Sequence, residues 1–186
     1  MSQTCFLSYY PSPLGTLALA SDGQAVTGIW FKKQKYFASG VNLDDPGSYQ
    51  EVGLDRLPVF IQTKTWLDSY FAGHDPGPIP PVKVSGTPFQ EAVWRILREI
   101  PYGRTTTYGR IADRLAKEEG KEHMSAQAVG FAVGHNKVSL LIPCHRVLGA
   151  GGKLTGYAAG LDVKERLLAL EKAGSAGSPD TTDALI

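Results

Sequence analysis

A cysteine and a histidine stand side by side at Cys144 and His145, in the apolar stretch 141–147 (LIPCHRV). A cysteine attacks as its thiolate, and a nearby base or positive charge makes that thiolate available near neutral pH. If the stretch is extended, the two side chains point to opposite faces, and a proton passes between them through water. A third group should orient the imidazole, and Glu171 on the expected C-terminal helix is the candidate. Taken alone, Cys144 also fits a buried structural cysteine.

The remaining cysteines and histidines do not have the spacing of a metal site. They are scattered along the chain, without the short paired spacing of zinc ligands, as Cys5, His74, His123 and His135. We therefore expect no metal site. Two cysteines cannot build a disulfide framework, and the first residues lack the basic start and apolar stretch of a secretory signal. The expected setting is the reducing cytoplasm.

The composition predicts a soluble globular protein. Of 186 residues, 42% are hydrophobic and 20% charged, and no apolar run approaches the ~20 residues of a membrane span. We expect no membrane partner. The net charge of +1 conceals a split, because residues 1–84 hold 6 basic and 7 acidic residues whereas residues 85–172 hold 13 and 9. The modest excess around Cys144 fits a nucleic-acid partner and also ordinary surface variation.

The first half predicts a small antiparallel sheet with one helix. Residues 5–10, 16–20 and 25–31 are short β-prone runs separated by turn residues at 11–15 and 21–23. Residues 32–56 are a polar connection, and apolar residues then recur at helical spacing from Val59 until Gly73. The proline-rich segment 75–81 (DPGPIPP) predicts a stiff linker, so we expect a first α/β domain over residues 1–84.

The second half predicts a mostly helical domain over residues 85–172, which makes the chain α+β. Thr87 begins a capping box with proline at the first helical position. Thr107 and Ser125 can cap two more short helices, which form a helix-turn-helix with a longer joint at 117–124. A last helix is expected from Asp162 to Glu171. We expect residues 173–186 to be a disordered tail.

An ordered set of short motifs covers nearly all of residues 86–171. They are 86–90 (GTPFQ), 100–103 (IPYG), 107–109 (TYG), 128–130 (AVG), Asn136, 142–147 (IPCHRV), 156–157 (GY) and 164–165 (KE). In this order they resemble the O6-alkylguanine-DNA alkyltransferases, also called methylated-DNA:protein-cysteine methyltransferases. Upstream the similarity is looser, with a turn at 12–15 (SPLG) and a helix ending near 70–73 (YFAG).

The resemblance implies direct-reversal DNA repair. In that family the cysteine attacks the alkyl carbon on O6 of a damaged guanine, keeps the group as a thioether and is spent after one turnover. Cys144 would accept the group from O6-alkylguanine, and also from O4-alkylthymine. His145 would pass on the thiol proton through water, with Glu171 hydrogen-bonded to its ring. Because the protein itself is the acceptor, the resemblance implies no cofactor.

The resemblance also assigns the residues around the base. Tyr108 would donate a hydrogen bond toward the N3 edge of guanine and so quench the charge of the departing base. Asn136 would tie the end of the second helix of the helix-turn-helix to the active-site strand. The other implied pocket residues are Val147, Tyr157, Ala158 and Ala159.

The implied partner is double-stranded DNA containing O6-alkylguanine, bound by a monomer. The reacting atom lies inside the base stack, so the nucleotide must be flipped out. The second helix of the helix-turn-helix would enter the minor groove, where small residues allow a close approach and readout is degenerate. Gln127 stands where the family normally has an arginine, so flipping would be weaker or helped by His135 or Arg110. The implied DNA-binding residues are Ser125, Ala126, Gln127, Ala128, Gly130, Arg110 and Arg146.

Three other functions compete with this interpretation. A DNA-binding sensor of alkylated bases resembles this half of the chain, but such proteins lack the cysteine that is present here as Cys144. A thiol hydrolase with a Cys-His-Glu site would turn over repeatedly, and no stretch of the sequence indicates an oxyanion loop. A transcription factor would need strong positive charge and a dimer interface, and the sequence indicates neither.

Overall fold

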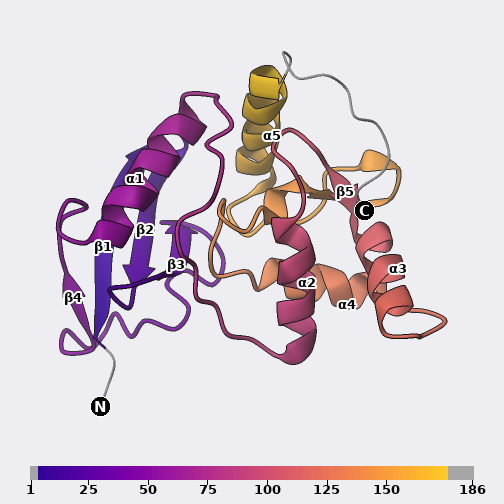
Figure 1. Ribbon diagram of the computed structural model, residues 1–186, viewed down its shortest axis with the longest axis horizontal. Helices are drawn as coiled ribbons and strands as arrows, with labels where there is room; N and C mark the ends of the chain where they lie inside the picture. Colours follow the sequence, from indigo (N-terminus) through magenta and orange to yellow (C-terminus); the bar gives the residue numbers. More distant parts are fainter. Residues whose placement is uncertain (1–3, 176–186) are drawn as a thin grey trace. The chain divides into compact units, whose positions relative to one another are not determined.

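The computed structural model describes residues 4–175 of the chain, which divide into two compact units. Within the described residues, the first unit is 4–84 with Lys137–Leu141, and the second is Ser85–Asn136 with 142–175. The α+β class expected from the sequence is confirmed, with a sheet and one helix in the first unit and a mostly helical second unit (Figure 1). Residues 137–141 group with the first unit, not with residues 85–172 as the sequence analysis assigned them.

The first unit is built on a four-stranded sheet in the order β3-β2-β1-β4. The three expected strands are present as β1 (Cys5–Ser12), β2 (Gly15–Ser21) and β3 (Val26–Phe31), in antiparallel pairing. The sheet is mixed, however, because β4 (Tyr49–Glu51) pairs parallel with β1. This strand lies in the segment expected as a connection, and its three polar residues form a strand only because the edge of β1 supplies hydrogen-bonding partners.

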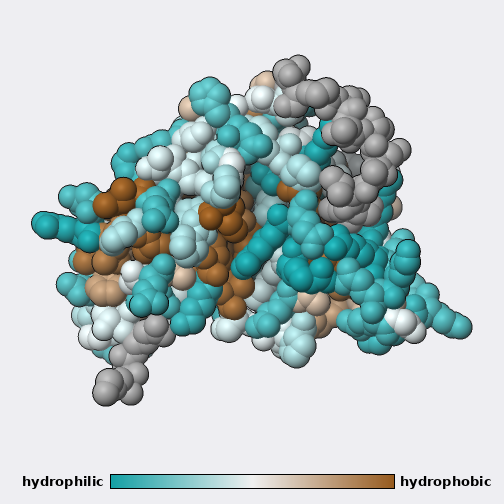
Figure 2. Space-filling view, in the orientation of Figure 1, coloured by the Kyte–Doolittle hydropathy of each residue, from teal (hydrophilic) through white to brown (hydrophobic). Residues whose placement is uncertain are grey.

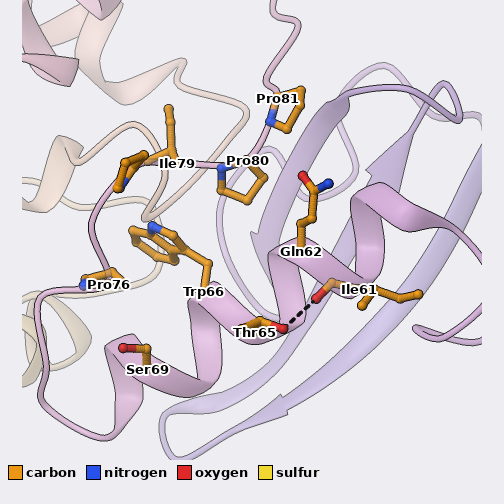
Figure 3. Close-up of a pocket in the computed structure, with 10 residues that line it drawn as sticks. Ile61, Gln62, Thr65, Trp66, Ser69, Pro76, Ile79, Pro80 and Pro81 are labelled. Carbon is orange, nitrogen blue, oxygen red and sulfur yellow. Dashed lines mark hydrogen bonds between the residues drawn. The ribbon is translucent and has the colours of Figure 1, made fainter.

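Helix α1 (Pro58–Phe71) carries an apolar stripe that includes the buried residues Phe60, Trp66 and Tyr70. The proline-rich segment after it packs on the same unit, since the Trp66 indole donates to the Gly77 carbonyl at 3.2 Å. The pocket between this segment and α1 has a volume of about 490 Å³. Figure 3 shows its prolines facing one side of α1. This pocket lies wholly within the first unit and has no titratable side chain in its lining.

The segment Lys137–Leu141 is fastened to β3 by backbone hydrogen bonds. The amide of Ile29 donates to the Lys137 carbonyl at 2.8 Å, and the amide of Ser139 donates to the Ile29 carbonyl at 3.0 Å. These bonds, 108 and 110 residues apart along the chain, explain why the segment belongs to the first unit. Sequence periodicity carries no signal for pairing over such a separation.

The second unit contains four helices, two 3₁₀ turns and one short strand pair among its described residues. The helices are α2 (Pro88–Arg98), α3 (Tyr108–Glu118), α4 (Ala126–Gly134) and α5 (Leu161–Ser175). The 3₁₀ turns are η1 (Cys144–Arg146) and η2 (Ala150–Gly152), and β5 (Thr106–Thr107) pairs parallel with β6 (Val147–Leu148). The β5–β6 pair places the start of α3 beside the residue that follows η1.

Local capping explains where three of these helices begin. The capping box at Thr87 is formed, and the side chains of Thr107 and Ser125 accept hydrogen bonds from the amides of Arg110 and Ala128. These three predicted caps are confirmed. Helices α3 and α4 form the expected helix-turn-helix, and the indole of Trp94 fixes α4 from behind through the Ala132 carbonyl at 2.9 Å.

Both predicted ends of the last helix are wrong. Helix α5 begins at Leu161, so Asp162 lies inside its first turn. Its negative charge there is stabilised by the positive end of the helix dipole. The helix continues through Ser175, whose hydroxyl donates to the Lys172 carbonyl at 3.2 Å, and residues 173–175 are therefore ordered. The rest of the expected disordered tail, residues 176–186, lies outside the described residues.

The second unit shows a hydrophilic face over α2 and α3 (Figure 2). Two arginines and two glutamates bridge these helices there, with Arg114 to Glu99 at 2.6 Å and Arg95 paired with both Glu99 and Glu118. Such exposed pairs contribute little stability each, roughly 0–1 kcal/mol. Across residues 4–175, no helix combines the length and the apolar character needed to cross a membrane.

Candidate active site around Cys144

Cys144 begins the 3₁₀ turn η1 and is only 6% exposed. The stretch is therefore not extended, and the active-site strand expected from the sequence is a tight turn after Pro143. Asn136, two residues beyond α4, donates from Nδ2 to the Ile142 carbonyl at 2.8 Å and to the Cys144 Sγ at 3.2 Å. The predicted tie by Asn136 is thus present in this geometry, and it fixes the sulfur directly. Hydrogen bonding to sulfur favours the thiolate.

His145 and Glu171 form a buried pair, as the sequence analysis expects. The His145 Nε2 lies 2.6 Å from Glu171 Oε1, and the two side chains are 0% and 1% exposed. The Gly103 amide donates to Glu171 Oε2 at 3.1 Å. A carboxylate accepting from the ring makes Nε2 the protonated nitrogen of a neutral imidazole, which leaves the basic lone pair on Nδ1.

Arg146 is an internal partner of Glu171 and not a surface DNA contact. Its guanidinium donates to both carboxylate oxygens, from Nε to Oε2 at 2.9 Å and from Nη2 to Oε1 at 3.0 Å. A third bond runs from Nη1 to the Ile100 carbonyl at 2.6 Å. The residue is 7% exposed and its donors are engaged inside the unit, which speaks against the DNA-binding role predicted for it. The planar fork of arginine fits this two-bond contact to one carboxylate.

These contacts keep Glu171 charged and His145 neutral. Burial alone would raise the pKa of Glu171, but three effects outweigh it and lower the pKa to about 2: the charge that His145 carries at the low pH where Glu171 titrates, the hydrogen bonds from His145 and Arg146, and the charge of Arg146. Burial lowers the pKa of His145 below its usual value, against the raising effect of Glu171 and with further lowering by the charges of Arg146 and Lys164. The imidazole is therefore available as a base at neutral pH.

Lys164 is a buried cation that the sequence analysis did not single out for a role. It is 0% exposed, and its Nζ donates to the carbonyls of Val147 at 2.6 Å and Thr155 at 2.8 Å. Burial lowers its pKa to about 8, opposed by the negative charge of a Cys144 thiolate. A signal existed in the sequence, because Lys164 shares the helical spacing of the buried residues Leu167 and Glu171.

Opposing influences act on the thiol itself. Burial raises the pKa of Cys144, while the Asn136 hydrogen bond and the charge of Lys164 lower it in part. The sulfur is thus a thiol at rest that needs a base to react.

Tyr108, at the start of α3, lies half-buried with Lys164 Nζ 6.0 Å from its ring centre. Burial also raises the pKa of Tyr108, which keeps its hydroxyl a hydrogen-bond donor at neutral pH.

The structure places the other sequence-predicted residues in two groups. Val147 is buried on β6, and the Tyr157 ring stands edge-on to His145 at 6.5 Å between centres. Ala158 and Ala159 follow in the same half-buried loop. The first turn of α4 is exposed, with Gly130 one turn further on, where a Cβ would lie 3.7 Å from the Tyr108 ring. The exposed residues of this second group are Ser125, Ala126, Gln127, Ala128 and, on α3, Arg110.

No metal centre accompanies these groups in the part of the chain that the structure describes, since no three His, Cys, Asp or Glu residues come together to hold an ion. The fold and the site define a protein with a buried thiol next to a buried histidine–glutamate pair, in the same unit as a helix-turn-helix.

Comparison with known proteins identifies the family to which the chain belongs. The family model described as the DNA binding domain of 6-O-methylguanine DNA methyltransferase matches residues 88–173, and the model of that family's ribonuclease-like domain matches residues 6–77. The methylated-DNA–protein-cysteine methyltransferase of Haemophilus influenzae is 41% identical over 90% of this chain and 86% of its own length. The chain therefore belongs to the 6-O-methylguanine DNA methyltransferase family, which confirms the resemblance.

Other relatives agree over nearly the full length. The methylated-DNA–protein-cysteine methyltransferase of Methanosarcina acetivorans is 39% identical over 89% of this chain and 97% of its own. The crystal structure of Mycobacterium tuberculosis OGT in complex with DNA superimposes with a TM-score of 0.75 at 35% identity, covering 91% of this chain and 94% of that one.

Proposed function

We propose that this protein repairs methylated DNA directly, by moving the alkyl group from O6 of a guanine onto its own Cys144. The observation that carries the proposal is the buried sulfur, which Asn136 holds at 3.2 Å beside a His145–Glu171 pair closed at 2.6 Å. Family membership supports the same chemistry, because the relatives are methylated-DNA–protein-cysteine methyltransferases. A single thiol then serves as both nucleophile and final acceptor.

The reaction begins with removal of the thiol proton. His145 accepts it through a water molecule, and Glu171, already ionised by Arg146, stabilises the imidazolium that forms. The thiolate attacks the alkyl carbon, so that the S–C bond forms as the C–O6 bond breaks and its electron pair passes to the guanine. Tyr108 donates its hydroxyl proton toward N3 of the departing base, and the proton held by His145 restores the phenol.

The product explains why the protein acts once. A thioether is stable to water, and none of the residues around Cys144 supplies a chemistry that would cleave it. The alkyl carbon has no further acceptor, so neither a metal nor a cofactor enters the balance. The reducing cytoplasm, which keeps Cys144 a thiol, is the setting that suits this chemistry.

Double-stranded DNA containing O6-alkylguanine is the substrate we assign, with O4-alkylthymine as a second one. The target atom lies within the base stack, so the nucleotide must rotate out to reach a buried sulfur. Helix α4 offers the contact surface, since its exposed first turn consists of small or polar residues from Ser125 to Ala128. Small side chains allow the backbone to approach the narrow minor groove closely. The protein acts as a monomer.

Intact-mass measurement after incubation with a duplex containing one O6-methylguanine tests this function. The expected result is a gain of one methyl group, mapped to Cys144 by peptide analysis and saturating at one per chain, with an unmethylated duplex as control. A lesion sensor would bind without gaining mass, and a thiol hydrolase would release product repeatedly without saturation. A transcription factor would prefer one sequence with or without the lesion. Any of these three outcomes would contradict the proposal.

A further inference from the structure

Three large apolar side chains are exposed in the described part of the second unit, and one of them is far more exposed than the other two. Phe131 on α4 is 64% exposed, which is more than any other large hydrophobic residue between 4 and 175. The opposite side of the helix explains this orientation, because Val129, Ala132 and Val133 form its buried face. Because the Trp94 indole donates a hydrogen bond to the Ala132 carbonyl at 2.9 Å, α4 is held on its buried side and Phe131 points outward.

The exposed ring is held in place. The rings of Phe131 and His135, one helical turn apart, have centres 4.1 Å apart at an angle of 36°. The His135 Nδ1 lies 2.8 Å from the Phe131 carbonyl oxygen, which fixes the imidazole to the helix. Single exposed apolar residues are common on protein surfaces. A supported aromatic ring is different, because little side-chain entropy is lost when it inserts into a partner.

The position of the ring connects it with the site. Its neighbour Gly130 faces Tyr108, with 3.7 Å from an added Cβ to the Tyr108 ring. Gln127 lies four residues before Phe131 and is also exposed, so the two side chains are neighbours on the outer side of α4. An amide and an aromatic ring therefore stand side by side on the helix surface that adjoins the candidate base contact.

We propose that Phe131 is an aromatic wedge that enters the base stack of duplex DNA beside the flipped nucleotide. The inference rests on the proposed function and extends it to the residue that opens the stack. Apolar side chains inserted from the minor groove unstack base steps and bend the duplex. Gln127 can hydrogen-bond the base left without its partner but has no ring to stack there. The two tasks are thus divided between Gln127 and Phe131, with His135 supporting the wedge.

The test compares alkyl transfer by Phe131→Ala with two substrates, a duplex containing O6-methylguanine and the free base O6-methylguanine. Aromatic stacking on a base is worth enough that its loss should slow the duplex reaction roughly tenfold. The free base has no stack to open, so its reaction rate should not change. Phe131→Trp keeps a wedge and should retain most of the duplex rate. Ile61→Ala, which removes another exposed apolar side chain from the first unit, should change neither rate.

A second measurement reports on the stack itself. With 2-aminopurine next to the lesion, binding of the Cys144→Ser protein should raise fluorescence through unstacking, and adding Phe131→Ala should remove most of that rise. The inference is overturned if Phe131→Ala keeps the full duplex rate, or if it slows the free-base reaction equally, as a structural defect would. If the proposed function itself is wrong, the result is different, because the unsubstituted protein would then gain no methyl group from either substrate. That outcome would also overturn the role proposed for Phe131.

Discussion

The two units bury polar groups of different kinds. In the first unit the buried polar side chains are all neutral, with the hydroxyls of Ser8, Ser21, Thr63 and Ser139 and the amide of Gln34. In the second unit the buried set includes the ionisable side chains of His145, Arg146, Lys164 and Glu171, all within 0–7% exposure. Within residues 4–175, these four are the only buried His, Arg, Lys or Glu residues, and no Asp is buried.

This difference indicates that the buried ionisable side chains of the second unit serve its chemistry and not its folding. Burying a charge costs several kcal/mol even when it is paired, so a core that only has to fold gains nothing from burying Arg146, Lys164 and Glu171 in addition to a neutral His145. Their grouping in the unit that holds Cys144, with the pKa values of Glu171 and Lys164 shifted to about 2 and about 8, is typical of a functional site. The first unit therefore offers matched controls, residues of the same type whose substitution should leave the chemistry intact.

The largest effect is expected for the two cysteines, one in each unit. Cys144→Ser should reduce methyl transfer below detection, because an alcohol has a far higher pKa than a thiol and His145 cannot ionise it. Cys5 lies on β1, and the sulfur contact there is a weak one of 3.9 Å to the Phe6 carbonyl. Cys5→Ser should methylate at the normal rate. Intact mass after incubation with the methylated duplex measures both, and methylated Cys5 would contradict the distinction between the units.

Glu171 should give the second largest effect, measured as stability in urea. Lowering its pKa from 4.5 to about 2 corresponds to about 3 kcal/mol of stabilisation. This agrees with the ~3–5 kcal/mol usually lost when one partner of a buried pair is removed. Glu171→Gln should therefore lower the free energy of unfolding by about 3 kcal/mol at pH 7. In the first unit, Lys64→Gln breaks a half-exposed pair with Asp68 and should cost under ~1 kcal/mol.

The pH dependence of the free energy of unfolding shows in which pH range the charge of Glu171 stabilises the fold. Because the folded-state pKa is depressed, the stabilisation is complete above the unfolded value of 4.5 and is lost as the pH falls toward about 2. The gap between the unsubstituted protein and Glu171→Gln should thus be nearly constant from pH 5 to 7, narrow as the pH falls below 4.5 and close only as the pH falls below about 2. A gap that keeps its full size at pH 2.5 would mean that packing, and not charge, is what the substitution removes.

Two tyrosines, one in each unit, extend the comparison to the rate of alkyl transfer. Tyr108→Phe removes the donor for the departing base and should slow transfer by about 10²-fold, the usual effect of losing one such donor. Tyr10 in the first unit donates to Asp68 at 2.8 Å, and Tyr10→Phe should cost about 1 kcal/mol of stability with no change in rate. Single-turnover transfer from duplex DNA and urea unfolding, measured on both variants, decide this. Equal rate losses would remove Tyr108 from the mechanism.

Local signals explain what the sequence alone predicts correctly. The caps at Thr87, Thr107 and Ser125 act within three residues, so the starts of α2, α3 and α4 follow from the chain itself. The pairing of His145 with Glu171 is anticipated from the chemistry a cysteine nucleophile requires and from the family resemblance.

Long-range pairing explains what the sequence alone does not predict. Strand β4 exists because of β1, more than 40 residues away, and Arg146 is internal because Glu171 takes up its guanidinium. The spacing of Lys164 with Leu167 and Glu171 indicates the buried face of α5, but the carbonyls of Val147 and Thr155 that bind the buried ammonium leave no pattern in the sequence. The missed residues thus share one property, which is that their partners belong to other segments.

The smallest expected effect belongs to the two exposed glutamines, Gln127 on α4 and Gln62 on α1. Gln127→Arg adds a guanidinium that can both stack and carry charge where the orphaned base is exposed, so it should raise the rate on duplex DNA several-fold. Gln62→Arg adds the same charge to the first unit and should change the rate little, which isolates position from net charge. The measurement is single-turnover methyl transfer from the duplex at two salt concentrations.

The salt dependence decides how the gain at Gln127 arises. A purely electrostatic gain would shrink as salt rises, and Gln62→Arg would share part of it. A gain from stacking would survive high salt and would be smaller when Phe131 is intact than in Phe131→Ala, because the wedge already fills part of that role. An unchanged or lower rate for Gln127→Arg would contradict this account of position 127, because an arginine there would then add nothing to the amide.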